Sequence, residues 1–271
     1  MPVTDVLVSD RGAFRADMAR SARLLRAFRT EQAAPDAYYA GLGRDTACQL
    51  SQYLDLAGRV VADVGGGPGY LAREFRAAGA RVVCLDTDRG ELAGLGRAVP
   101  GSAVGSALRL PLASGSVDVC FSANVLEHVA DWRAMLAEMV RVTRPGGIVF
   151  VAFTNWLSPW GGHETSPWHY LGGERAARRY ERRHGRPPKN RYGASLYPVS
   201  VAAALAWARS ARGAVLVDAV PRYLPGWTRP LLRVPVLREF LTWNLLLVLR
   251  RTGPERDWQP GRPGQRTGAA G

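Results

Sequence analysis

Short apolar runs alternate with stretches of helical periodicity through the middle of the chain. The runs are rich in β-branched and aromatic residues, which predicts buried strands, and the stretches between them place apolar residues three or four positions apart. Strands that alternate with helices predict an α/β fold. The predicted strands cover residues 60–64, 81–85, 102–110, 116–122, 148–153, 214–220 and 243–249.

Helices are predicted before the first strand and between later strands. Two of them precede the first strand, one over 11–32 and one from Pro35 to Leu54. The others cover 71–78, 90–98, 131–142, 174–184 and 199–212. We therefore expect cap helices in 1–54, a main domain in 55–252 and a disordered Gly/Pro/Arg-rich tail in 253–271.

Residues 155–198 interrupt the alternation of strands and helices. This segment of more than 40 residues combines tryptophans, histidines and Gly/Pro turns with a basic stretch. A connection of that length in a compact domain is more often functional than a simple linker. We expect an insert that covers a site as a lid.

A glycine-rich turn follows the first predicted strand. Asp63 and Val64 lead into Gly65, Gly66, Gly67 and Gly69, and a helix begins at once. Glycine permits a positive φ in such a turn and lets the backbone approach a ligand closely. The third glycine of a dinucleotide fingerprint, G-x-G-x-x-G, is replaced here by Tyr70, so the spacing is G-x-G-x-G. A turn with only a structural role is the alternative.

An acidic residue ends the second predicted strand. Asp86 follows Asp63 by 23 residues. A carboxylate at this place in an α/β fold can accept hydrogen bonds from both hydroxyls of a ribose. A solvated acidic strand end is the alternative, but the turn and the acid together favour a nucleoside site.

The glycine turn resembles motif I of the class I S-adenosylmethionine-dependent methyltransferases. The block SVDVCFSANVLEHVADWRAMLAEMVRVTRPGGIVFVAF resembles the type 11 family, and GGHE…PWHYLGG resembles a bacterial group within it to which no substrate is assigned. The resemblance implies a Rossmann-like sheet of seven strands, the last antiparallel, with an insert after strand 5. It also implies S-adenosylmethionine as cofactor, with Asp63 near its methionine amino group.

The resemblance also implies which residues contact the cofactor. GSALRLPL departs from the family pattern, because Ser106 stands where an acid usually contacts adenine, so that contact falls to the backbone at Ala107 and to Leu108. The predicted cofactor-binding residues are Asp63, Gly65, Gly67, Gly69, Asp86, Thr87, Ser106, Ala107, Leu108 and Ser122.

Histidines supply the candidate catalytic groups. His128 follows the fourth strand, and its ordinary pKa suits a general base for a hydroxyl acceptor. His163 and Glu164 on the insert are further candidates, and a structural role is the alternative for each.

We assign no metal site. Some relatives bind a divalent ion through E-x-x-E-H, which leaves a site of Glu127, His128 and His163 as an alternative, although Asn124 replaces the first acid.

Composition and charge add limits on partners and location. The net charge is +13, and arginine supplies almost all of the positive charges. Three cysteines, two of them within apolar strands, predict free thiols in a reducing compartment. The first residues lack the pattern of a secretory signal, so we expect a cytoplasmic protein. The oligomeric state stays open.

These features favour methyl transfer to an oxygen or nitrogen of a small-molecule or lipid- or saccharide-linked acceptor. Nucleic acid is not the expected partner, because no N-P-P-[FYW] or D-P-P-Y tetrad occurs; the basic stretch 175–191 keeps it as an alternative. A second alternative is a non-catalytic adaptor in peripheral contact with a membrane through the Arg/Trp/Leu-rich segment 221–241.

Overall fold

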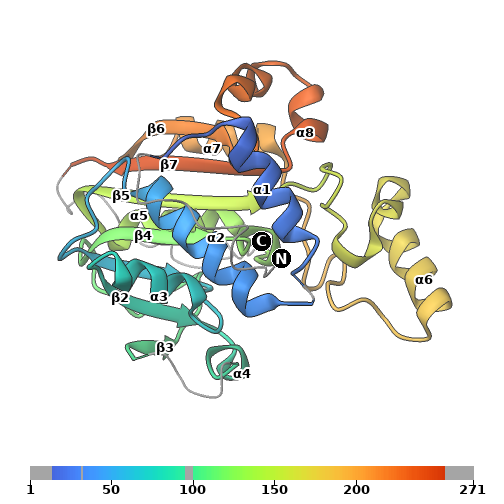
Figure 1. Ribbon diagram of the computed structural model, residues 1–271, viewed down its shortest axis with the longest axis horizontal. Helices are drawn as coiled ribbons and strands as arrows, with labels where there is room; N and C mark the ends of the chain where they lie inside the picture. Colours follow the sequence, from blue (N-terminus) through green and yellow to red (C-terminus); the bar gives the residue numbers. More distant parts are fainter. Residues whose placement is uncertain (1–13, 32, 95–99, 254–271) are drawn as a thin grey trace, which may run out of the picture.

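The computed structural model describes residues 14–31, 33–94 and 100–253, and it contains one mixed sheet of seven strands (Figure 1). The strand order is β3-β2-β1-β4-β5-β7-β6, and β7 runs antiparallel to both of its neighbours. The predicted α/β class and the antiparallel last strand are therefore confirmed. The strands are β1 (Val60–Val64), β2 (Arg81–Asp86), β3 (Ser102–Val104), β4 (Val117–Ala123), β5 (Thr143–Thr154), β6 (Ala214–Pro221) and β7 (Asn244–Arg251).

Several predicted elements have different ends in the structure, for local reasons. The helix predicted over 199–212 begins only at Val201, because the Ser200 side chain accepts a hydrogen bond from the Ala203 N–H at 3.1 Å and caps it. The strand predicted over 102–110 ends at Val104. The helices are α1 (Met18–Phe28), α2 (Pro35–Leu50), α3 (Tyr70–Ala77), α4 (Arg89–Leu92), α5 (Trp132–Val142), α6 (Gly173–His184), α7 (Val201–Arg209) and α8 (Leu237–Leu241).

Parts of the other predictions lie outside the described residues. Of the helix predicted over 11–32, residues 14–31 are described, and α1 begins after Asp17, whose carboxylate accepts from the Arg20 N–H at 2.7 Å. Residues 95–98 of the predicted fourth helix and 254–271 of the predicted tail are not described. The second predicted helix ends at Leu50 instead of Leu54.

The central strands bury both of their faces. On β4, Val119 and Phe121 pack with α2 and α3, whereas Cys120 packs with α5 and α7 on the opposite face. Both faces of such a strand need apolar side chains, so the sequence shows a continuous apolar run instead of alternation. Cys84 and Cys120 are buried, and all three cysteines are free, as predicted.

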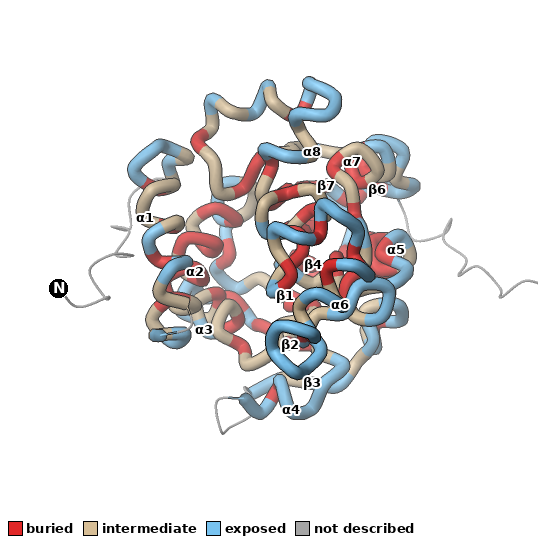
Figure 2. The backbone as a smooth tube through the Cα atoms, turned by 90° about the vertical axis from the view of Figure 1, so that its right-hand side faces the viewer, coloured by how far each residue is buried: buried red, intermediate tan, exposed pale blue. Residues whose placement is uncertain are grey.

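The insert occupies the edge of the sheet where β1, β2 and β4 end. Residues 155–198 form 3₁₀ turns at His163–Thr165 and Trp168–Leu171 and then α6, which projects beyond this edge (Figure 1). Figure 2 looks onto the same edge and shows α6 in front, exposed along most of its length. In open α/β sheets, ligands bind at the carboxyl ends of the strands. The insert therefore covers the expected ligand edge.

A second irregular segment joins β6 to β7. It contains the 3₁₀ helix Gly226–Arg233 and α8, and it lies beside α1, where the Gly226 N–H donates to the Ala16 carbonyl at 2.6 Å. Within the described residues, none of the helices combines the length and apolar content that crossing a membrane requires.

Candidate functional site

The turn between β1 and α3 has the backbone that its glycines predict. Gly65, Gly67 and Gly69 have φ values of +73°, +48° and +80°. Side chains with a Cβ rarely adopt this left-handed region, so glycine relieves strain at each of these positions. The chain thereby turns sharply from the strand into the first turn of α3.

The turn is tightly packed on one side and open on the other. A Cβ on Gly65 would lie 2.4 Å from a methyl carbon of Val125, and a Cβ on Gly66 would lie 2.4 Å from the Cys84 sulfur. A Cβ on Gly67 would meet no atom within 4 Å. The backbone at Gly67 therefore faces open space in which a ligand can approach it.

Asp63 lies beneath this turn with an unpaired oxygen. Its side chain is buried, and Oδ2 has no hydrogen-bond partner. Burial and, to a lesser extent, the nearby Asp86 carboxylate raise the pKa of Asp63 to about 7, against the opposing effect of Arg76. A buried carboxylate without a donor is costly unless a partner supplies one. The residue is thus suited to a cationic ligand group.

Asp86 joins the turn to the end of β2. Its Oδ2 accepts from the Gly67 N–H and its Oδ1 from the Asp88 N–H, both at 3.0 Å. A carboxylate oxygen has two lone pairs, so each oxygen keeps one free acceptor position. Thr87 is exposed beside it. The structure therefore brings the predicted acid and the glycine turn together.

The other predicted cofactor residues are divided between surface and core. Ser106 is exposed and its hydroxyl accepts from the Leu108 N–H at 3.2 Å; this turn is what ends β3 early. Leu108 is exposed, whereas Ala107 packs against the core. Ser122 is buried, and its hydroxyl donates to the Val64 carbonyl at 2.8 Å. The hydroxyl of Ser122 is thus used to join β4 to β1.

Glu127, His128 and His163 form a second cluster. One ligand atom from each residue lies within 4.8 Å of the others, and the two histidine rings are 5.1 Å apart. His128 Nδ1 lies 2.7 Å from the Ser195 carbonyl oxygen, which can only accept. Nδ1 therefore carries the proton, which leaves Nε2 of the neutral ring with a free lone pair.

Glu127 is buried and His163 is half-buried, and each has a buried side-chain atom without a partner. Glu127 Oε1 accepts from the Thr154 N–H at 3.0 Å, but Oε2 has no partner. Burial raises the pKa of Glu127, and His128 opposes the rise. Burial also lowers the pKa of His163 to about 4, and its Nε2 has no partner. His163 is therefore neutral at pH 7.

Val125 connects the two parts of the site. Val125, whose side chain lies against Gly65, comes three residues before His128. Glu164 lies on the same 3₁₀ turn as His163, but its carboxylate is exposed and accepts from the Asn190 side chain at 3.0 Å. His169 is buried, and its Nε2 lies 3.1 Å from the Ser158 carbonyl oxygen. The structure therefore unites His128 and His163, and it gives Glu164 a bond within the insert.

Comparison with known proteins identifies the family. Residues 62–151 match the type 11 model described as a methyltransferase domain. A protein of Mycolicibacterium paratuberculosis named an uncharacterized methyltransferase is 50% identical over 260 residues, which are 92% of this chain and 99% of that protein. The chain is a member of the methyltransferase family. A second methyltransferase, from Mycobacterium marinum, is 49% identical over 89% of this chain and 98% of its own length.

Solved structures support the fold of this methyltransferase. An S-adenosylmethionine-dependent methyltransferase from Mesorhizobium loti matches with a TM-score of 0.53 and 21% identity, over 75% of this chain and 96% of that one. At that identity the match shows the fold alone. The fold and the family together imply S-adenosylmethionine as the methyltransferase's cofactor.

Proposed function

We propose that this methyltransferase holds S-adenosylmethionine against the glycine turn and transfers its methyl group to an oxygen or nitrogen of a small-molecule or lipid- or saccharide-linked acceptor. The observation that carries the proposal is the free Nε2 of His128, fixed by the Ser195 carbonyl and next to the turn through Val125. A base in that position serves a hydroxyl acceptor.

The chain's residues fit the cofactor. The unpaired Oδ2 of Asp63 suits the ammonium of the methionine moiety, and the free acceptor positions of Asp86 suit the two ribose hydroxyls. Leu108 offers an exposed apolar side chain for the adenine. The open space at Gly67 lets the ligand lie against the backbone.

The chemistry asks little of the protein beyond positioning and proton transfer. The cofactor supplies a sulfonium-activated methyl group, so no residue has to create the electrophile. His128 Nε2 would take the proton of an acceptor hydroxyl, and the Ser195 carbonyl would keep the ring oriented. The neighbouring Glu127 carboxylate would stabilise the positive charge that the ring gains. The insert would exclude water from this edge.

Unpaired polar atoms next to the paired ends of β5 and β7 suit a polar acceptor. Four buried side-chain oxygens at the end of β5, in the following turn and at the start of β7 have no partner. Such atoms are costly unless a ligand or water bonds to them. They belong to Asn155, Ser158, Thr242 and Asn244.

Affinity for S-adenosylmethionine is expected to depend on the charge of Asp63. In the free protein its pKa is about 7, and the cofactor's ammonium would lower it by favouring the carboxylate. Binding therefore releases a proton at low pH, and affinity should rise about tenfold from about pH 5.5 to about pH 7.5. Calorimetry at both pH values measures this rise. Asp63→Asn should bind weakly with no such rise, and an equal rise in that variant would contradict the assignment.

A metal-assisted reaction is the second candidate, favoured by the unpaired atoms of Glu127 and His163. A divalent ion there would act as a Lewis acid on the acceptor, and two nitrogens with one oxygen suit a zinc-like ion. Asn124 does not join the three, because its backbone is left-handed (φ +56°) and its Oδ1 accepts from Asn244. We expect turnover to survive treatment with a chelator. Loss of turnover that only a metal restores would favour the second candidate.

The direct test is to identify the methylated product. Extracts of a mycobacterium, the source of similar relatives, would be incubated with the protein and S-adenosylmethionine carrying an isotopically labelled methyl group. We expect the label in a small polar molecule or a lipid, and about 100-fold slower labelling of a hydroxyl acceptor by His128→Ala. Label in RNA would support the nucleic-acid alternative, and no label in any fraction would contradict the proposal.

A further inference from the structure

Exposed apolar side chains are concentrated on three segments. Of the 17 large apolar residues exposed in the described parts of the chain, two lie on α1, four within residues 160–171 and six within residues 226–241. Exposed apolar patches of this kind mark interaction surfaces. The twelve, which we call the docking face, are Met18, Phe28, Trp160, Trp168, Tyr170, Leu171, Trp227, Val234, Val236, Leu237, Phe240 and Leu241.

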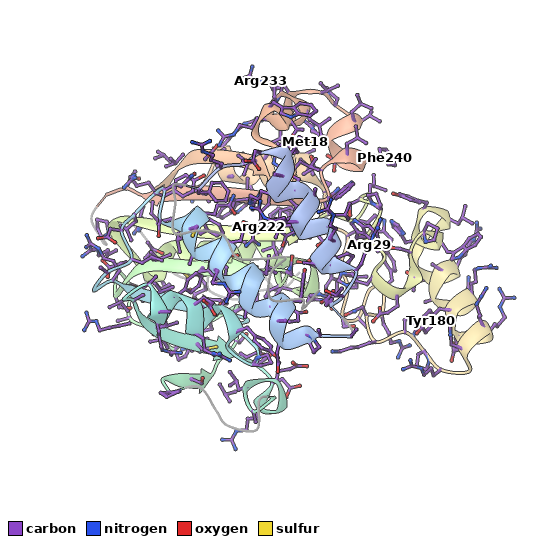
Figure 3. The ribbon with its side chains drawn as sticks, in the orientation of Figure 1. Met18, Arg29, Tyr180, Arg222, Arg233 and Phe240 are labelled. Carbon is purple, nitrogen blue, oxygen red and sulfur yellow. The ribbon has the colours of Figure 1, made fainter. Side chains whose placement is uncertain are left out.

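Contacts between aromatic rings join the three segments. Phe28 of α1 lies 5.2 Å from Trp160, measured between ring centroids, and Tyr170 lies 6.1 Å from Phe240 of α8. Figure 3 labels Met18 on α1, Phe240 on α8 and Arg233, which lies at the top of that view. The docking face thus includes part of the insert that carries His163, and its three segments are in contact with one another.

The charges on α1 and on residues 226–241 are almost all positive, whereas residues 160–171 carry one exposed acid, Glu164, and no arginine or lysine. Residues 18–29 contain four arginines and no acid, and one of the four, Arg20, is buried and paired with Asp45. Residues 226–241 contain three arginines, of which Arg229 is paired with Asp218, and one acid, Glu239. The Glu239 carboxylate points away from this surface, since it accepts from the Val201 and Ala202 N–H groups at 2.7 and 2.8 Å. Arg26, Arg29 and Arg233 are exposed. An apolar face with cationic residues complements an anionic lipid surface.

The segment 226–241, which we call the tip of the docking face, contains a residue in a strained conformation. Val236 has a φ of +68° and a ψ of −61°, which is unfavourable for a β-branched residue. Its side chain is 65% exposed, and Trp227 on the same segment is 74% exposed. Strain of this kind persists where the surrounding structure imposes it, and it gathers at functional positions. Here it directs an apolar side chain into solvent.

We propose that the docking face binds the surface of an anionic phospholipid bilayer, with the 226–241 tip inserted among the lipids. Apolar insertion and attraction by arginines are two separate signals, and together they give stable peripheral binding. The inference extends the proposed function, because a lipid-linked acceptor could then reach the His128 cluster from the membrane.

The test is flotation of the full chain with vesicles, without any acceptor. With vesicles of phosphatidylglycerol and phosphatidylcholine we expect binding at least about tenfold stronger than with phosphatidylcholine alone, and weaker binding as salt rises. The variant Trp227→Ser/Val236→Ser/Leu237→Ser should lose at least about tenfold in vesicle affinity. The variant Arg26→Gln/Arg233→Gln should lose the preference for anionic lipid.

A matched control keeps the test specific. Val215 and Val217 are comparably exposed apolar residues on the edge strand β6, outside the docking face, so Val215→Ser/Val217→Ser should bind vesicles like the wild type. Unchanged cofactor affinity in every variant shows that it is folded. Absence of binding to anionic vesicles at low salt, or equal losses in the triple variant and the control, would overturn the proposal. The proposal would also be overturned if the chain formed a dimer in solution that the triple variant dissociates and the other variants do not.

The two proposals fail in different ways. Vesicle binding by a chain that transfers no methyl group would leave the docking face in place and refute the proposed function. Methyl transfer by a chain that does not bind anionic vesicles would support the proposed function and refute the docking face.

Discussion

The variant His128→Ala is expected to lower the rate of methyl transfer to a hydroxyl acceptor by about 100-fold or more, which is the usual contribution of a general base. The proton on Nδ1 is held by the Ser195 carbonyl, so Nε2 is the only ring atom able to take a proton. Within the part of the chain that the structure describes, no hydrogen bond links the His128 ring to the glycine turn. Cofactor affinity should therefore stay within about twofold of the wild-type value, a difference of less than about 0.5 kcal/mol.

Steady-state kinetics with the identified acceptor measure this effect as a fall in kcat. His184→Ala is the matched control, because that histidine is exposed on α6 outside the cluster, and it should retain wild-type turnover. Full turnover by His128→Ala would contradict the assignment of a general base and would mean that the His128 ring has only a structural role.

The variant Asp86→Ala is expected to weaken binding of S-adenosylmethionine by about 2–4 kcal/mol, or about 30- to 1,000-fold. The change removes the acceptors for the ribose hydroxyls. It also removes the oxygen that accepts from the Gly67 N–H, so the turn itself is less well ordered for the ligand. Calorimetric titration with the cofactor measures the loss.

Two further variants separate these causes. Asp86→Asn keeps an acceptor oxygen and the side-chain shape, so its loss of affinity should be intermediate. Asp88→Ala removes a nearby acid that caps α4 through the Gly90 N–H, and cofactor affinity should change little. Wild-type affinity in Asp86→Ala would mean that the ribose contact has been assigned to the wrong residue.

The parts of the fold that the sequence predicted depend on local signals. Apolar runs identified the central strands because both faces of those strands are buried. The glycine turn was predicted because its backbone requires positive φ values, which the residue type reveals. The apolar pattern places the start of α7 at Val199, two residues too early, because the cap at Ser200 sets the first turn; a serine before an apolar helix is the signal that marks such a cap.

The parts of the site that the sequence could not predict depend on backbone groups from distant segments. The Ser195 carbonyl that orients His128 and the Thr154 N–H that holds Glu127 have no sequence signature, since every residue carries both groups. The left-handed backbone of Asn124 was also missed. Asparagine adopts that conformation more readily than most residues, and this explains its presence better than weak metal ligation does.

The central claim is that the glycine turn and the carboxylates of Asp63 and Asp86 form a cofactor site. Calorimetric titration of the purified chain with S-adenosylmethionine tests it most directly. We predict one molecule bound per chain, with a dissociation constant between about 1 μM and 1 mM, the usual range for enzyme substrates. Absence of any binding heat at millimolar cofactor, with the chain folded, would contradict the claim.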